Sequence, residues 1–192
     1  MGSMASRVST TRESQTPPPL APEGRRALGL VTLWDGSATH ECAIPLWCQS
    51  AQRLASMIPP PWQTQLVVIA PRASDECTKA SYVWRNDTAE ANDAYLSRVP
   101  IKGSWSYLKN CLLLKWSVFA MTEFDLILYT DIDVDLTPSH SRLVASPWVV
   151  AMEAFLRSPA LIVNTPDHSS PINMGVFLAK PAPWVHLSLI HI

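Results

Sequence analysis

The sequence predicts an α/β fold, a Rossmann-like three-layer α/β/α arrangement around a mostly parallel sheet. Short, continuous apolar runs, typical of strands covered on both faces, alternate with stretches of helical periodicity. The strand runs are 27–33, 65–70 and 126–129, and helices are expected at 44–58 and 147–156. Strand, helix and strand with short connections form a parallel unit whose crossover is right-handed.

The first half of the chain predicts one such unit. Residues 27–33 form a buried strand that ends in a turn at 34–37. Apolar residues then recur at helical spacing over 44–58, until three prolines at 59–61 stop the helix. Residues 65–70, rich in Val and Ile, form the second strand.

The second half continues the alternation. Residues 105–121, without internal Pro or Gly, form a helix that leads into the strand run LILY at 126–129. A further helix, 147–156, begins at a proline, which the first turn of a helix tolerates. The remaining expected elements are, in chain order, a strand at 82–84, a helix at 88–96, a helix at 105–121, a strand at 126–129, a helix at 147–156, a strand at 161–163 and a strand at 173–180.

Lys115 stands out in the predicted helix 105–121. On a helical wheel it shares the apolar stripe with Leu108 and Leu112. Because an unpaired buried ammonium is costly, Lys115 either extends its amine to solvent or finds an anion. The helix leads directly into an acidic segment, so a carboxylate or phosphate partner is expected.

The acidic segment is 124–136, FDLILYTDIDVDL, with aspartates at 131, 133 and 135. Three carboxylates crowded at the end of a buried strand repel one another unless a cation lies among them. Carboxylate oxygens suit hard divalent ions, and the carboxyl ends of strands are where open α/β sheets bind ligands. We therefore favour a metal site over a polar loop that merely ends the strand.

Composition excludes some classes of partner. The 192 residues carry a net charge of −1, and no basic run predicts nucleic-acid binding. No apolar stretch is long enough for a transmembrane segment. Residues 1–26 lack the hydrophobic region of a secretory signal and read as a disordered tail. These features favour a cytoplasmic location and leave the oligomeric state open.

The four cysteines show no C-x-x-C pairing, which argues against a zinc site. They are Cys42, Cys48, Cys77 and Cys111. We expect them to be free, reduced and buried, as is usual in the cytosol.

Three segments of the chain combine into a recognisable set. Lys115-Trp116 precedes an apolar run that ends in Asp131-Ile132-Asp133, residues 172–177 read INMGVF and are followed by Lys180-Pro181, and residues 30–33 read LVTL. Together they resemble the glycogenin-like family of retaining, GT-A type nucleotide-sugar glycosyltransferases. They are similar, in turn, to the family's helix lysine, apolar strand and D-x-D motif, to its F-N-S-G-V strand and to its first strand.

The resemblance implies a UDP-sugar donor, a glycan or protein acceptor, and transfer of a hexosyl or related unit with retention. Mn²⁺ or Mg²⁺ held by Asp131 and Asp133 would stabilise the charge that develops on the leaving diphosphate. It implies catalytic roles for Asp167 and Asn173. The substrate-binding residues that it implies are Val31, Leu33, Asp35, Lys115, Asp131, Ile132, Asp133, Asn173 and Gly175.

The family's C-terminal H-x-x-G-x-x-K-P-W motif does not occur before the chain ends at Ile192. We therefore expect the glycosyltransferase domain, 27–192, to lack its C-terminal part. One alternative is a truncated domain that binds a nucleotide sugar without turning it over. A more distant one is a haloacid-dehalogenase-like phosphatase, with Asp131 as nucleophile and Asp133 as general acid/base.

Overall fold

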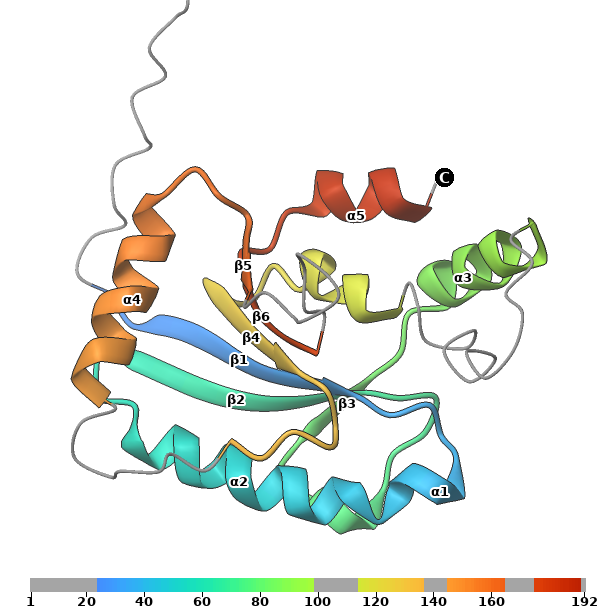
Figure 1. The fold of residues 1–192 in the computed structure, drawn as a ribbon, viewed down its shortest axis with the longest axis horizontal. Coiled ribbons are helices and arrows are strands. Elements are labelled where there is room, and N and C mark those ends of the chain that lie inside the picture. Colours follow the sequence, from blue (N-terminus) through green and yellow to red (C-terminus); the bar gives the residue numbers. More distant parts are fainter. Residues whose placement is uncertain (1–23, 99–113, 137–144, 165–174, 191–192) are drawn as a thin grey trace, which may run out of the picture.

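The computed structural model describes residues 24–98, 114–136, 145–164 and 175–190. Within them, six strands form one sheet in the order β3-β2-β1-β4-β6-β5 (Figure 1). The strands are β1 (Arg26–Leu33), β2 (Trp62–Ile69), β3 (Ser81–Val83), β4 (Leu126–Thr130), β5 (Ile162–Asn164) and β6 (Val176–Ala179).

The sheet is mostly parallel, as predicted. β1 pairs in parallel with β2 and with β4, and β2 pairs in parallel with β3. β6 alone runs against its neighbours, antiparallel to both β4 and β5. The carboxyl ends of β1, β2, β3 and β4 therefore lie at one edge of the sheet, together with the amino end of β6.

Helical segments cover both faces of the sheet, which confirms the three-layer prediction (Figure 1). α2 and α4 pack on one face, whereas α3, η3 and α5 lie over the other. The helices are α1 (Ala38–Glu41), α2 (Ala43–Met57), α3 (Asn86–Arg98), α4 (Ala145–Arg157) and α5 (Pro183–Ile190), and the 3-10 helices are η1 (Asp75–Cys77) and η3 (Leu114–Ala120).

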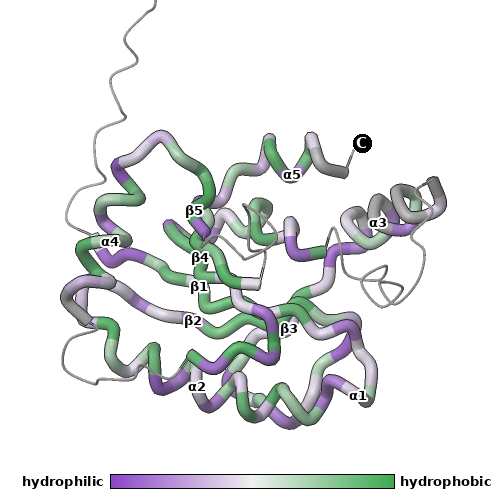
Figure 2. The backbone as a smooth tube through the Cα atoms, in the orientation of Figure 1, coloured by the Kyte–Doolittle hydropathy of each residue, from purple (hydrophilic) through white to green (hydrophobic). Residues whose placement is uncertain are grey.

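β1 shows how the strand pattern supplies two cores. Leu28 and Leu30 pack against α2, while Val31 and Leu33 pack in the core on the η3 side. Alternate side chains of a strand point to opposite faces of the sheet, so an unbroken apolar run fills both layers. Figure 2 shows these hydrophobic stretches concentrated along the central strands.

The predicted helix 105–121 is only partly described, and that part is not α-helical. Residues 105–113 lie outside the described segments, and Leu114–Ala120 forms the 3-10 helix η3. Its turn places Leu114, Val118 and Phe119 in the core. Packing against the sheet therefore selects a tighter winding than the side-chain periodicity predicts.

The chain after Pro181 forms a helix that was not among the predicted elements. Residues Pro183–Ile190 make up this helix, α5. Pro183 occupies its first position, where no intrahelical N–H is needed. On a helical wheel the sequence that follows, WVHLSLI, spreads its apolar residues instead of gathering them on one stripe, so it has no amphipathic period by which the helix could be predicted.

The prediction of free, buried cysteines is wrong in the described residues. Cys48 on α2 and Cys77 in η1 form a disulfide with a Cα–Cα distance of 5.9 Å. Cys42 has a free thiol but is exposed, and Cys111 lies outside the described residues. The thiol argument for the cytosol therefore no longer stands. None of the helices described is both long and apolar enough to cross a membrane.

Replacing Cys48 and Cys77 by serine is expected to lower the free energy of unfolding by about 3 kcal/mol, because the bond restricts the unfolded chain. Urea denaturation followed by tryptophan fluorescence measures the difference. Cys42→Ser, which removes an exposed free thiol, should leave the midpoint unchanged. Equal midpoints for the double variant and the wild type without reductant would contradict the bond.

Candidate active site

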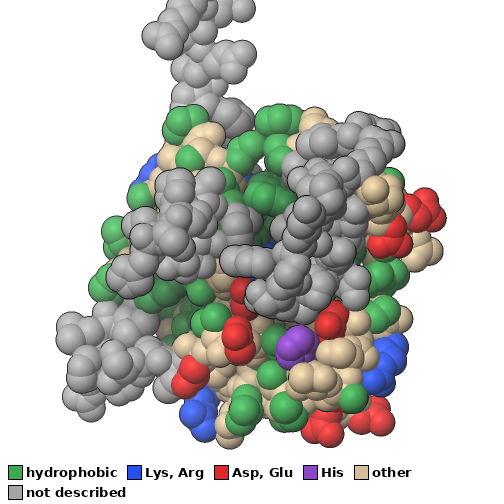
Figure 3. All heavy atoms as spheres, turned by 45° about the vertical axis from the view of Figure 1, so that its right-hand side comes forward, with side chains coloured by type: hydrophobic (Ala, Val, Ile, Leu, Met, Phe, Trp, Pro, Cys, Tyr) green, Lys and Arg blue, Asp and Glu red, His purple; other side chains and the backbone are tan. Residues whose placement is uncertain are grey.

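The candidate site lies at the edge of the sheet where the parallel strands end. β1 leads into the turn 34–37, and β4 leads into the segment 131–136. Ligands of open α/β sheets bind outside the carboxyl ends of the strands. Figure 3 brings this side of the molecule forward and shows several acidic side chains on it.

The central contact joins η3 to the end of β4. Lys115 Nζ lies 2.6 Å from Asp131 Oδ1, and the Tyr129 hydroxyl donates to the same oxygen at 3.0 Å. The side chains of Lys115 and Asp131 are 17% and 35% exposed, so the pair is partly shielded from water. The expectation that Lys115 finds a carboxylate is confirmed.

Backbone contacts hold Asp131 as well. Its N–H donates to the carbonyl of Gly175 at 2.7 Å, and its own carbonyl accepts from Val134 N–H at 3.1 Å. Gly175 precedes β6, whose antiparallel register pairs Val176 with Thr130. This pairing brings Gly175, far along the chain, beside the D-x-D motif.

Asp133 lies beside α2, in the segment that follows the end of β4. After the turn at 131–134 the chain runs beside α2 (Figure 1), and Ile132 and Asp133 line a pocket with that helix. Asp133 is exposed, whereas Asp131 is held against Lys115. Within the described segments, no group of three His, Cys, Asp or Glu side chains could hold a metal ion. In these segments the two predicted carboxylates are therefore present without a third His, Cys, Asp or Glu side chain grouped with them.

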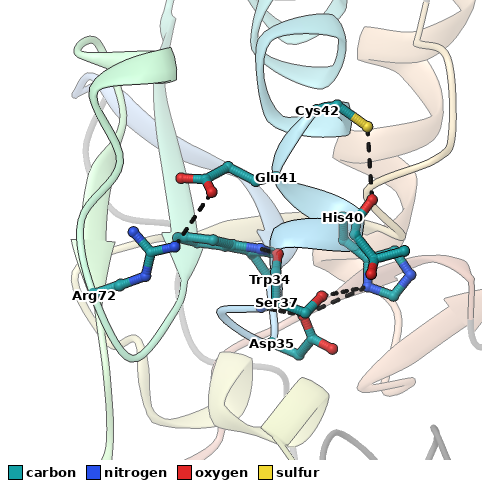
Figure 4. Close-up of polar contacts among 8 residues, drawn as sticks. Trp34, Asp35, Ser37, His40, Glu41, Cys42 and Arg72 are labelled. Atoms are coloured by element: carbon teal, nitrogen blue, oxygen red, sulfur yellow. Dashed lines mark hydrogen bonds and ion pairs between the residues drawn. The ribbon is translucent and has the colours of Figure 1, made fainter.

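The site residues predicted in β1 and in the turn after it differ in whether their side chains can reach a ligand. Val31 and Leu33 have buried side chains in the core on the η3 side, so only their backbone is available to a ligand. Asp35 instead presents its carboxylate at the turn after β1 (Figure 4). Gly36 makes this turn at a φ of 81°, and a Cβ there would lie 2.8 Å from the Pro71 ring.

Asp35 is held by its neighbours in the turn. Ser37 N–H donates to Asp35 Oδ1 at 2.9 Å, and His40 Nδ1 lies 3.5 Å from the same oxygen. Burial raises the pKa of Asp35, but the hydrogen bonds from Ser37 and the charge and hydrogen bond of His40 lower it by more. The net pKa lies below the ordinary 3.8.

Asp35, Ser37 and His40 do not form a catalytic triad, despite their residue types. The Ser37 hydroxyl lies 3.2 Å from His40 Nδ1, the same nitrogen that faces Asp35. A triad requires the carboxylate and the nucleophile on different imidazole nitrogens. The cluster orders the turn (Figure 4) and carries no proton relay.

Arg72 also lies at this edge and was not predicted. Its guanidinium stacks over Trp34, 4.5 Å from the ring centroid, and pairs with Glu41 at 3.3 Å (Figure 4). The available signal was its place directly after the second strand and Pro71, since the loops that follow parallel strands converge at one edge.

Lys180 lies at the opposite edge, because β6 runs antiparallel. Its amine contacts the carbonyls of Phe155 and Ser158 at the end of α4. Cations are favourable at helix C-termini, so this lysine caps the helix. Two residues with predicted catalytic roles, Asp167 and Asn173, lie outside the described residues.

No protein-family model and no curated protein matches the sequence. Solved structures do match. Mouse xyloside xylosyltransferase 1, in its apo form, aligns at a TM-score of 0.51 and 15% identity, over 86% of this chain and 74% of that one. The chain has the GT-A fold. This likeness concerns the fold, and the glycogenin-like subfamily is not confirmed by it.

Two further glycosyltransferase structures align at lower TM-scores. The galactosyltransferase LgtC, in complex with donor and acceptor sugar analogues, gives 0.49 at 12% identity over 81% of this chain. GlyE from Streptococcus pneumoniae TIGR4 gives 0.44 at 10% identity over 87%. The aligned part spans 59% of the LgtC chain and 36% of the GlyE chain.

Lys115→Met is expected to lower the free energy of unfolding by about 1–2 kcal/mol, because Asp131 loses a charged hydrogen-bond partner while remaining partly buried. Urea denaturation at pH 7 measures the loss. Lys79→Met, a change at an exposed lysine, serves as the control and should leave stability near the wild-type value. A Lys115→Met variant as stable as this control would show that the pair contributes nothing.

Asp35→Asn is expected to destabilise the protein at neutral pH, with a gap to the wild type that narrows in acid. A carboxylate whose pKa is lowered by folding stabilises the native state above its unfolded pKa of about 3.8. This contribution is lost as the pH falls through the lower folded-state pKa. Urea midpoints between pH 7 and pH 3 test it, with Asp93→Asn as the exposed control. A pH-independent gap would contradict the expectation.

Proposed function

We propose that the chain is a nucleotide-sugar glycosyltransferase that moves a hexosyl or related unit from a UDP-sugar to an acceptor with retention. The observation that carries this proposal is the D-x-D motif at the end of β4, with Asp131 held by Lys115, at the ligand-binding edge of a GT-A fold. A carboxylate fixed from both side chain and backbone offers a preorganised anchor.

The described residues fit a hard divalent ion, Mn²⁺ or Mg²⁺, as a partial site. Both described side-chain contacts of Asp131 fall on Oδ1, which leaves Oδ2 for a ligand, and Asp133 is exposed. Such ions are commonly held by one or two carboxylates together with substrate phosphates and water. The ion would supply positive charge where the leaving diphosphate becomes more negative.

Each predicted site residue would then have its own role in binding the donor. Lys115 positions the Asp131 carboxylate and adds positive charge beside the diphosphate. Gly175, with no side chain, allows close approach of the sugar beside Asp131. Asp35 and the backbone of Val31 and Leu33 would contact the nucleotide at the end of β1. Ile132, the middle residue of the D-x-D motif, would contact it at the end of β4.

Two alternative functions remain, and a specific experimental result would support each of them. The phosphatase hypothesis makes Asp131 the nucleophile, and Oδ2 is the oxygen that neither Lys115 nor Tyr129 contacts. A stable beryllium fluoride complex formed with Mg²⁺ would support it. Donor binding without any hydrolysis or transfer would instead identify a nucleotide-sugar-binding domain that lacks turnover.

UDP with Mn²⁺, each near ten times its dissociation constant, is expected to raise the melting temperature by roughly 4 °C, because a ligand of the native state stabilises it by mass action. Differential scanning fluorimetry measures the shift. Asp133→Asn should abolish the part of the shift that depends on Mn²⁺, whereas Asp93→Asn should retain it. No shift at millimolar UDP and Mn²⁺ would overturn the proposal.

A further inference from the structure

A pocket of about 360 Å³ lies between α2 and the segment that follows Asp131. Its volume is in the range of small-molecule sites. α2 contributes one stripe of residues at helical spacing, and the chain after the D-x-D motif forms the facing wall. The lining residues that matter below are Leu46, Trp47, Gln49, Arg53, Asp133 and Asp135.

The lining carries charges of both signs on opposite walls, so the space between the walls favours neither a bare anion nor a bare cation. Arg53 comes from α2, and Asp133 and Asp135 come from the opposite wall. In the part of the chain that the structure describes, the Arg53 guanidinium and the Asp133 carboxylate share no hydrogen bond or ion pair. An anion would meet two carboxylates, and a bare cation would meet the guanidinium. A neutral ligand that both donates and accepts hydrogen bonds satisfies both groups.

The rest of the lining matches such a ligand. Gln49 is exposed and offers an amide, which can both donate and accept. Leu46 is 69% exposed beside it and supplies apolar surface. The buried Trp47 ring also lines the pocket and is held in place by its Nε1, which donates to Thr130 Oγ1 at 2.9 Å. Apolar surface with a few polar groups from two walls fits a sugar ring, which has C–H faces and a rim of hydroxyls.

We propose that this pocket binds a neutral glycoside, the acceptor of the transfer. The assignment of the glycoside as acceptor rests on the proposed function, because Asp133 belongs both to the pocket wall and to the proposed donor site. A hydroxyl held beside Asp133 is therefore next to the donor, as group transfer requires. Gln49 and Arg53 are the residues of α2 that orient the glycoside.

The test is a titration of the full chain with methyl β-D-glucoside, methyl β-D-galactoside and methyl β-D-xyloside, followed by ¹H–¹⁵N NMR. At least one probe is expected to shift the Trp47 indole N–H and the Gln49 amide saturably. Gln49→Ala and Arg53→Ala should each weaken that probe by about tenfold, the loss expected for one hydrogen bond to a charged or well-placed group. Arg157→Ala, at an exposed arginine of α4, is the matched control and should bind as the wild type does.

The outcomes separate this inference from the proposed function. No saturable shift with any glycoside, or shifts that Gln49→Ala and Arg53→Ala leave unchanged, would overturn the pocket assignment. Equal or larger shifts with inorganic phosphate would also overturn it, since the lining is assigned to a neutral ligand. UDP and Mn²⁺ should stabilise Arg53→Ala as they stabilise the wild type. Absence of that stabilisation in the wild type would sink the donor proposal, while the glycoside titration would still decide the pocket.

Discussion

The geometry of the candidate site, at the edge where the parallel strands end, depends on the pairing of Lys115 with Asp131. This pairing joins η3 to the end of the central strand β4, while the backbone of Asp131 bonds to Gly175 at the start of β6. Three segments distant in sequence thus meet at one residue, Asp131. Because Asp131 is fixed, the direction of the chain after it is fixed as well, and this direction lays Asp133 along α2.

Sequence reasoning found the strands because unbroken apolar runs need cover on both faces, and the fold supplies that cover. It failed where tertiary contacts choose between local states. Leu114–Ala120 has a helical period in its sequence, yet packing winds it as a 3-10 helix. The Cys48–Cys77 bond was missed for a related reason, since 29 residues separate the cysteines and only the packing of α2 against η1 brings them together.

In the candidate site, too, some contacts follow from local sequence and others depend on the tertiary fold. The Lys115–Asp131 pair was predictable because a costly buried charge needs a partner, whatever the detailed fold. The Arg72–Trp34 stack and the α2 pocket were not, since each joins segments whose approach depends on the crossover between strands. Val31 and Leu33 were assigned to the nucleotide from a resemblance, and their burial limits any such contact to the backbone.

The disulfide also bears on where the protein acquires its final form. Cys48 lies on the same helix as the residues that line the pocket, directly before Gln49. Protein disulfides form and persist mainly in oxidising compartments, whereas cytosolic thiols are kept reduced. A chain that forms this bond as it matures would do so in such an oxidising compartment. In a reducing compartment, α2 would be held by packing alone, and the pocket wall would lose its covalent tie to the loop after β2.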